Sequence, residues 1–486
     1  MEDNLFKKVV AHAKEYGFIF QSSEIYDGGL QAVYDYGQYG VELKNNIKQL
    51  WYKSMVQLND NIVGLDTAIF MNPTVWKASG HVDSFNDPMI DNKDSKKRYR
   101  ADVLLEDKAA TYEESNPEKA QEILNRLGKS LEEEDLKAVY DLIMEEEIVC
   151  PISKTSNWTD VRQFNLMFGT QVGSVAEDST QIYLRPETAQ GIFVNFLNVQ
   201  KTGRMKIPFG IAQIGKAFRN EIVARQFIFR QREFEQMEMQ FFVRPGTEME
   251  WYNKWKETRL SWHKAIGLDE DKLKYHDHEK LAHYANAAVD IEYKFPFGTK
   301  EIEGIHSRTD FDLNAHQEFS KKKLQYRDEE IKESYVPYVV ETSVGADRSF
   351  LAVFCNAYKE EVVGEGDKQK TRTYLKFHPA VAPIKAAILP LSKKGGLAEL
   401  AKEIVDELKF DYNVTYDDGG SIGKRYTRQD LIGTPFCFTV DFESLEDKMV
   451  TVRHRDSMEQ ERIPISEISN MIQKAVSYKN VFDEIS

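Results

Sequence analysis

The sequence contains few cysteines and no long apolar run. Cys150, Cys355 and Cys437 are far apart and odd in number, so they predict no disulfide framework. No apolar stretch approaches the roughly 18 residues that a membrane-spanning helix needs. The first residues, MEDNLFKKVV, lack the basic and apolar segments of a signal peptide. We therefore expect a cytoplasmic protein with no membrane partner.

Positive charge is also scarce. The 64 lysines and arginines are outnumbered by 79 acidic residues, which leaves a net charge of -15. Because non-specific binding of nucleic acid depends on basic surface, this balance excludes a general nucleic-acid binder. It leaves room for an RNA held by a local basic patch. The length of 486 residues predicts about three domains, and the composition is that of a globular protein.

The most informative stretch is Phe218–Val243, FRNEIVARQFIFRQREFEQMEMQFFV. If its second half is a strand, one face is polar and the other mostly apolar. The polar face carries Phe234, Gln236, Glu238 and Gln240. The face that we expect in the core carries Glu235, Met237, Met239 and Phe241. Four arginines lie at or before the start of this strand: Arg219, Arg225, Arg230 and Arg232.

A polar strand face is unfavourable to bury unless a ligand contacts it. Guanidinium groups bind phosphate through two hydrogen bonds, so this hairpin suits a nucleotide together with a molecule that carries an amine. The alternative is an ordinary charged hairpin whose arginines pair with its glutamates.

Three segments resemble the motifs of class II aminoacyl-tRNA synthetases, in the same order. A helical pattern at 34–56 and a strand-like run at 62–71, ending at Asn72-Pro73, resemble motif 1, which implies a homodimer interface. F-R-N-E, a loop and R-E-F-x-x-x-E resemble motif 2. Pro337–Phe354, a strand, a glycine turn and a helix, resembles motif 3, in which Arg348 would hold the γ-phosphate of ATP.

Other segments resemble glycyl-tRNA synthetases of the homodimeric type: Met71–Asp102, Trp158–Gly173, Gln181–Phe196 and Glu301–Asp312. This resemblance implies that Arg100 contacts substrate and that Glu301 reaches ATP through magnesium, which prefers hard oxygen ligands. Glu187 follows a predicted strand and should face whatever the sheet binds. Alternatively, its carboxylate stabilises the start of the next helix.

The resemblance implies two adjoining sites, with Arg219 and Arg348 as the catalytic residues. The ATP site would comprise Arg219, Asn220, Glu221, Phe229, Arg230, Gln231, Arg232, Glu233, Phe234, Glu301, Ile302, Gly345, Ala346, Asp347 and Arg348. The glycine site would comprise Arg100, Glu187, Phe234, Glu235, Gln236, Met237, Glu238, Glu341, Thr342, Ser343, Val344 and Gly345.

We expect an α/β (α+β) chain of two domains. Residues 1–379 would form an antiparallel-sheet catalytic domain with a charged, mainly helical insertion at about 82–150. Residues 380–486 alternate strand and helix patterns and resemble the mixed α/β anticodon-binding domain of the glycyl, threonyl, prolyl and histidyl enzymes. The basic patch for tRNA would consist of Lys424, Arg425, Arg428, Arg453 and Arg455.

Many relatives carry two C-x-x-C pairs in the insertion, which together bind zinc. Here only Cys150 remains, beside Ser153, and the other pair is replaced at Asn92 and Ser95. One thiolate cannot close a tetrahedral zinc site, so we expect no zinc.

The resemblance implies an ATP- and Mg²⁺-dependent enzyme that ligates glycine to tRNA(Gly) through a glycyl-adenylate and releases AMP and pyrophosphate. Two alternatives remain: an inactive paralogue that serves as an accessory subunit, and an adenylate-forming ligase of a free small molecule. Intact Arg219 and Arg348 disfavour the first, and the C-terminal domain disfavours the second. Among synthetases, the threonyl and prolyl enzymes are the nearest alternatives, but R-P-E-T-A-Q-G and E-T-S-V-G-A-D-R favour glycine.

Overall fold

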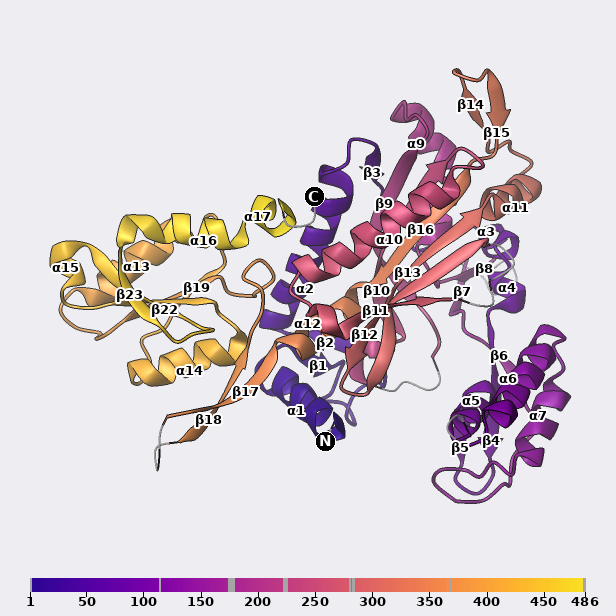
Figure 1. Cartoon of the computed structure of the whole chain (residues 1–486), viewed down its shortest axis with the longest axis horizontal. Coiled ribbons are helices and arrows are strands. Elements are labelled where there is room, and N and C mark those ends of the chain that lie inside the picture. The colour runs from indigo at the N-terminus through magenta and orange to yellow at the C-terminus, as the bar shows by residue number, and fades with distance from the viewer. Residues whose placement is uncertain are drawn as a thin grey trace.

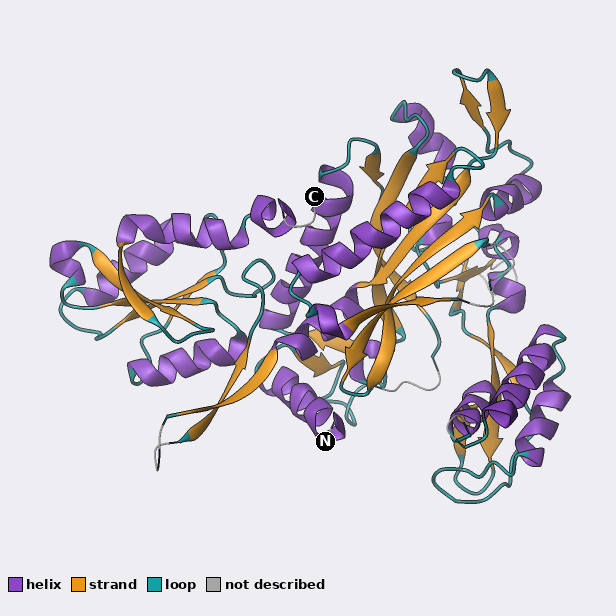
Figure 2. Ribbon diagram, viewed as in Figure 1, coloured by secondary structure: helices purple, strands orange, loops and turns teal. Residues whose placement is uncertain are grey.

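A central antiparallel sheet lies between a helical insertion and a separate C-terminal domain (Figures 1 and 2). The computed structural model describes residues 2–112, 115–173, 180–221, 226–278, 281, 285–364, 366 and 369–483. Within these ranges no helix combines the length and apolar character needed to cross a membrane.

The central sheet has seven strands. In spatial order they are β11 (Leu273–Asp277), β12 (Ala287–Phe295), β13 (Gly298–Thr309), β16 (Tyr338–Gly345), β10 (Glu233–Val243), β9 (Phe209–Phe218) and β3 (Ile62–Gly64). Every neighbouring pair is antiparallel except β3 with β9. Strand β3 ends earlier than the expected run at 62–71, because the backbone of Thr67 bonds to the side chains of Gln213 and Arg185 instead of the backbone of a neighbouring strand.

One face of the sheet is covered by three helices, α2 (Gln38–Tyr52), α10 (Glu248–Ala265) and α12 (Ala346–Ala357). Met237, Met239 and Phe241 are fully buried beneath these helices, as the period of two predicts. Glu235 shares this face, where Lys44 and Lys48 of α2 neutralise its charge at 2.7 and 3.1 Å.

The opposite face is covered only at one end. Helices α8 (Ala189–Val194), α9 (Phe196–Thr202) and α11 (Phe311–Ser320) bury a second apolar cluster there, which includes Phe193, Phe209 and Phe242. The remainder of this face carries the polar strand residues. It is the part of the sheet on which a ligand site can form.

The insertion has its own apolar core. Strands β4 (Asn86–Asn92), β5 (Lys97–Arg100) and β6 (Arg162–Asn165) form its sheet, beside helices α5 (Ala101–Ala110), α6 (Pro117–Glu132) and α7 (Leu136–Glu145). Asn116 and Asp135 cap α6 and α7 through side-chain oxygens. The insertion therefore extends to Asn165, beyond the expected limit near 150, because β6 returns to pair with β4.

Asn92, Ser95, Cys150 and Ser153, at which no zinc is expected, belong to a hydrogen-bonded cluster. Asn92 Oδ1 accepts hydrogen bonds from the backbone N–H of Ser95 at 2.9 Å and from Ser153 Oγ at 2.9 Å. Tyr99 Oη lies 3.1 Å from the buried Cys150 Sγ. In the part of the chain described, no three His, Cys, Asp or Glu side chains are grouped as metal ligands.

The C-terminal domain is a five-stranded mixed sheet with helices on both sides. Its strands, in spatial order, are β20 (Val414–Tyr416), β19 (Ala386–Pro390), β21 (Phe436–Val440), β22 (Met449–His454) and β23 (Gln460–Pro464). Its helices are α13 (Leu397–Leu408), α14 (Ile422–Ile432), α15 (Ser444–Asp447) and α16 (Ile468–Val476).

The expected boundary at 379/380 falls in the segment that joins the two apolar cores. The last helix, α17 (Tyr478–Asp483), departs from that division, because Val481 and Phe482 are buried in the core of the first domain. Lys53 Nζ lies 3.6 Å from the ring centre of Tyr478. The C-terminal domain is thus attached to the first domain at both ends.

The described chain has further α-helices and strands. They are α1 (Glu2–Glu15), β1 (Ile19–Gln21), β2 (Tyr34–Tyr36), α3 (Pro73–Ala78), α4 (His81–Ser84), β7 (Gly169–Val172), β8 (Thr180–Tyr183), β14 (Tyr326–Asp328), β15 (Glu333–Tyr335), β17 (Tyr358–Val363) and β18 (Lys370–Leu375).

Candidate active site

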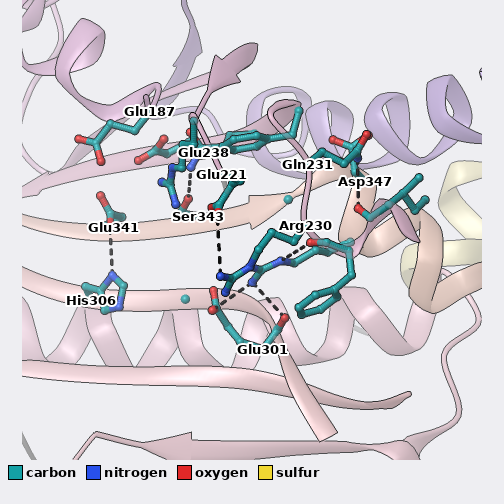
Figure 3. A pocket seen from close by; sticks show the side chains of 18 of the residues that line it. Glu187, Glu221, Arg230, Gln231, Glu238, Glu301, His306, Glu341, Ser343 and Asp347 are labelled. Atoms are coloured by element: carbon teal, nitrogen blue, oxygen red, sulfur yellow. Dashed lines mark hydrogen bonds and ion pairs between the residues drawn. The ribbon is translucent and has the colours of Figure 1, made fainter. Parts of the chain in front are cut away.

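A pocket of about 270 Å³ lies on the sheet face that the three long helices leave open (Figure 3). Strands β10, β13 and β16 form its floor, and α12 begins at its edge. Glu187, Glu238 and Glu341 gather at one end of the pocket, and Arg219, Arg230 and Arg348 line the rest of it together with Glu221 and Glu301 (Figure 3).

Three carboxylates, Glu187, Glu238 and Glu341, line the acidic end and gather on one side of the close-up view (Figure 3). Glu341 accepts hydrogen bonds from His306 Nδ1 at 2.9 Å and Arg308 Nη1 at 3.2 Å. Burial alone would raise the pKa of Glu341, but Arg308 and His306 outweigh burial and lower it. Glu341 is therefore ionised.

Glu187 is ionised for a similar reason. Its carboxylate lies 3.3 Å from His81 Nε2 and accepts a hydrogen bond from Gln190 Nε2 at 2.9 Å. Burial opposes the charge, yet His81 and Arg308 lower the pKa of Glu187 to about 2. The carboxylate does not act mainly on a helix terminus, because side chains from α4 and α8 hold it.

Glu238 differs from the other two carboxylates. Its hydrogen-bond partners are neutral: the Thr188 hydroxyl, and Gln240 Nε2 at 2.9 Å. Within the described residues, no lysine, arginine or histidine lies at ion-pair distance from it. Burial and the charges of Glu341 and Glu187 raise the pKa of Glu238 well above its ordinary value. The environment of Glu238 thus favours its protonated form, whereas the environments of Glu187 and Glu341 favour the carboxylate.

Arginines and aromatic rings form the other end. The Arg219 guanidinium lies between the rings of Phe85 and Phe234, 5.3 Å from each ring centre. Arg348 lies 4.5 Å from the Phe229 ring centre, and its Nη1 is 3.1 Å from a carboxylate oxygen of Glu301. Both guanidinium groups face the pocket, where they can meet phosphate oxygens.

Asp347 supports the basic end from below. It is buried and accepts hydrogen bonds from Lys44 Nζ at 2.7 Å, from the Tyr36 hydroxyl and from the Glu235 N–H at 2.8 Å. Helix α2 is thereby bonded to the start of α12 directly beside Arg348. The arrangement fixes the position from which the Arg348 side chain extends.

Most of the predicted residues line this pocket. From the expected ATP site these are Arg219, Glu221, Phe229, Arg230, Gln231, Phe234, Glu301, Gly345, Asp347 and Arg348, and from the expected glycine site Glu187, Phe234, Gln236, Glu238, Glu341, Ser343 and Gly345. Arg225 lies outside the described residues.

Ten predicted residues have no place in the pocket lining: Arg100, Asn220, Arg232, Glu233, Glu235, Met237, Ile302, Thr342, Val344 and Ala346. Strand alternation turns Met237, Thr342 and Val344 to the helix-covered face, where they are buried. Arg100 instead pairs with Asp87 and Asp102, at 3.3 and 2.5 Å.

Sequence reasoning missed Gly304, His306 and Arg308, which share a face of β13 and line the pocket. Simple strand alternation places these three residues on one face, but it places Glu301 on the opposite face. A β-bulge in β13 makes the difference: Ile291 pairs with Glu303, whereas its neighbour Glu292 pairs with Glu301. The extra residue, Ile302, lets Glu301 join the pocket side. His81 and Ile228 were also missed.

The expected basic patch for tRNA needs a correction. Arg425, Arg453 and Arg455 are buried, with exposed fractions of 3%, 6% and 2%. Arg425 donates to Pro390 O, and the other two bond to groups described below. A buried, paired guanidinium cannot contact a phosphate at the surface. Lys424 and Arg428 are exposed, and Arg428 pairs with Asp417 at 2.5 Å.

Models of known protein families match three parts of the chain. Residues 172–358 match the core domain of class II tRNA synthetases (G, H, P, S and T), and residues 385–475 match an anticodon-binding domain. Residues 87–121 and 114–166 match the glycyl-tRNA synthetase insertion domain 1. Together with the antiparallel sheet and its pocket, these matches define a class II aminoacyl-tRNA synthetase, an enzyme class that uses ATP.

Individual proteins of similar sequence identify the family within this class. A glycine–tRNA ligase of Chlorobaculum tepidum is 53% identical over 480 residues, which cover 96% of this chain and 98% of that protein. A glycine–tRNA ligase of Staphylococcus saprophyticus is 55% identical over 473 residues, which cover 97% and 98%. The chain belongs to the glycine–tRNA ligase family. The expected glycyl type is confirmed, in preference to the threonyl and prolyl types.

Proposed function

We propose that the pocket joins glycine to ATP and then transfers the glycyl group to tRNA(Gly). In the first step the glycine carboxylate attacks the α-phosphate, and pyrophosphate leaves. In the second step the terminal ribose of the tRNA attacks the adenylate, and AMP leaves. The observation that carries this proposal is the pairing of an acidic end with an arginine-rich end in one pocket.

The acidic end suits the ammonium group of glycine. Glu187 and Glu341 supply negative charge, and Glu238 completes the enclosure after it loses its proton. Glycine offers no side chain to bind, so the enzyme must reject larger amino acids by leaving no space beside the α-carbon. Steric exclusion can exceed the roughly 1–3 kcal/mol that an apolar pocket gains from one methylene. An editing domain is then unnecessary.

The basic end suits ATP. Arg219 would hold the α-phosphate and the attacking carboxylate, Arg348 the γ-phosphate, and Phe234 would stack on the adenine. To reach the phosphate, Arg348 must release Glu301. In-line displacement at phosphorus depends chiefly on alignment and on neutralising the developing charge, and these side chains provide both.

Magnesium belongs to this proposal as the ion that accompanies ATP. The Glu301 carboxylate fits it, because it is an exposed hard oxygen donor at the pocket wall. Bound there, the ion would neutralise phosphate charge. The residues of this chain still align the reacting groups.

The remaining parts of the proposal concern tRNA and assembly. We expect residues 1–379 to act as the catalytic domain and residues 380–486 as the anticodon-binding domain, with exposed Lys424 and Arg428 contacting tRNA. We also expect a homodimer formed through 34–73, and action in the cytoplasm, where tRNA is charged for translation.

The deciding experiment is ATP–pyrophosphate exchange with each standard amino acid, with and without magnesium. Exchange with glycine alone supports the assignment. Exchange with a different amino acid would remove the glycine pocket from the proposal. No exchange would favour an accessory protein. Glu341→Ala should lose glycine activation and still bind ATP, so normal turnover in that variant would contradict the role of the acidic end.

A further inference from the structure

The carboxylate of Asp430 bridges arginines of the two domains. Asp430, in the last turn of α14, is only 4% exposed. It accepts from Arg372 Nε at 2.9 Å and from Arg453 Nη1 and Nη2 at 2.9 and 3.0 Å. Arg372 lies on β18 of the first domain, whereas Asp430 and Arg453 belong to the C-terminal domain; α14 and β18 lie side by side (Figure 1).

Further bonds from both domains surround this carboxylate. Arg455 donates to Gly433 O at 2.8 Å and to Phe377 O at 2.7 Å, so it spans the junction. Arg372 Nη2 donates to the Arg455 carbonyl at 2.5 Å. His12 of α1 bonds to Leu431 O at 2.7 Å. We call Arg372, Asp430, Arg453 and Arg455 the interdomain joint.

The segment that connects the two domains, around residues 380–385, is also held by several hydrogen bonds. Asn46 of α2 donates to Val381 O and Ala382 O at 3.1 and 3.0 Å. The buried ammonium of Lys385 donates to Ala380 O and Ala382 O, both at 2.8 Å. Burial lowers the pKa of Lys385 to about 7. The connection between the domains is therefore a bonded segment and not a flexible linker.

The joint is balanced in charge. Arg372 also pairs with Glu361 at 2.6 Å, and Arg455 pairs with Asp456 at 2.7 Å. Three guanidinium groups thus meet three carboxylates. A buried ion pair adds little stability compared with apolar packing, but it fixes geometry, because sliding leaves a charge without its partner.

The proposed function gives this geometry a purpose. A tRNA must be held by its anticodon in one domain while its terminal ribose reaches the pocket of the other. We propose that Asp430 is a positioning residue that fixes the orientation of the anticodon-binding domain and so delivers the end of the tRNA to the pocket. This inference rests on the proposed tRNA-charging function.

The test is Asp430→Asn in the full chain, with three measurements. ATP–pyrophosphate exchange with glycine reports the pocket, binding of an RNA stem-loop with the tRNA(Gly) anticodon reports the C-terminal domain, and charging of full-length tRNA reports their coupling. We expect the first two to stay within twofold of wild type and charging to fall at least tenfold in kcat/KM. Asp430→Glu should recover part of the loss. Asp406→Asn, exposed on α13 of the same domain, is the matched control.

Unchanged charging in Asp430→Asn would overturn the inference. Loss of stem-loop binding in that variant would mean that its C-terminal domain has unfolded. The Glu361→Gln variant then tests the inference, because it removes a partner of Arg372 without changing α14. Reduced charging by Glu361→Gln, with exchange and stem-loop binding retained, supports the positioning role, and any other pattern refutes it. Failure of the wild type to charge tRNA would instead refute the proposed function.

Discussion

The Glu238→Gln variant tests whether the charge of the acidic end, and not only its shape, contributes to glycine binding. In the free pocket Glu238 bonds to Thr188 and Gln240, and burial together with the charges of Glu341 and Glu187 raises its pKa, which favours the neutral acid. Glutamine has the same size and can keep both hydrogen bonds, with its oxygen facing Gln240 and its amide facing Thr188. What the variant loses is the carboxylate that forms when an ammonium group enters. A charge-assisted hydrogen bond contributes about 1.5–3 kcal/mol.

That loss corresponds to a decrease of about 10- to 150-fold in kcat/KM for glycine, since about 1.4 kcal/mol is tenfold. ATP–pyrophosphate exchange at varied glycine concentration measures it. The KM for ATP should change little, because Glu238 lies beside Glu187 and Glu341, whereas Arg348 pairs with Glu301 at the other end of the pocket (Figure 3). Glu250→Gln, exposed on α10, is the control.

The pH dependence gives a second readout. Glycine binding should expel the Glu238 proton, so in the wild type kcat/KM for glycine rises with pH below the pKa of Glu238. The variant should lack that component. For stability the sign is opposite: the raised pKa means that Glu238 binds more proton in the native state than in the unfolded chain, so the contribution of Glu238 to stability falls as pH rises above about 4.3. Glu238→Gln should therefore melt higher than wild type at neutral pH. A variant with unchanged glycine KM and an unchanged pH profile would refute the reasoning.

Three further changes test other parts of the molecule. Arg348→Met should cut ATP–pyrophosphate exchange by about 100-fold, because one lost contact to transition-state charge costs about 3 kcal/mol; a loss below threefold would exclude the γ-phosphate role. Asn92→Ala should destabilise the insertion by about 1–3 kcal/mol, because the Ser95 N–H and the Ser153 hydroxyl lose the acceptor that the buried Asn92 provides; calorimetry can measure this against exposed Asn125→Ala, and glycine exchange should persist. Lys424→Ala with Arg428→Ala should raise the KM for tRNA severalfold and leave glycine exchange unchanged; equal charging kinetics would remove these residues from the tRNA interface.

Strand alternation made much of the pocket predictable. The polar positions of β10 and the pair Glu341 and Ser343 of β16 could be assigned to one face from the amino-acid pattern, because the side-chain period of a strand is two. The class and the order of its motifs also followed from the residues. The order of strands in the sheet did not, since β10 pairs with strands close and distant in sequence.

Long-range ion pairs were the main source of error in the C-terminal domain. From sequence, Arg453 and Arg455 suggest an exposed basic patch, because arginine is seldom buried without a partner. The partner of Arg453 is Asp430, 23 residues away, and Arg372 lies a further 58 residues before it. Nothing in the local pattern indicates these pairings. For the same reason the attachment of α17 to the first domain could not be predicted.

Strand β13 shows how partners, and not residue type, decide what a charged side chain does. Glu301 and Glu303 are two positions apart, and uninterrupted alternation would place them on one face. The bulge separates them, so Glu301 meets Arg348 at the pocket while Glu303 is buried on the helix side. There Arg259 and His263 of α10 hold Glu303 at 2.6 and 2.7 Å. Removing one partner of this fully buried group would leave a buried charge unpaired and destabilise the fold by about 3–5 kcal/mol. The cluster therefore holds β13 against α10 next to the bulge. One strand thereby carries a carboxylate that lines the pocket and a second that fixes the backbone on which the first depends.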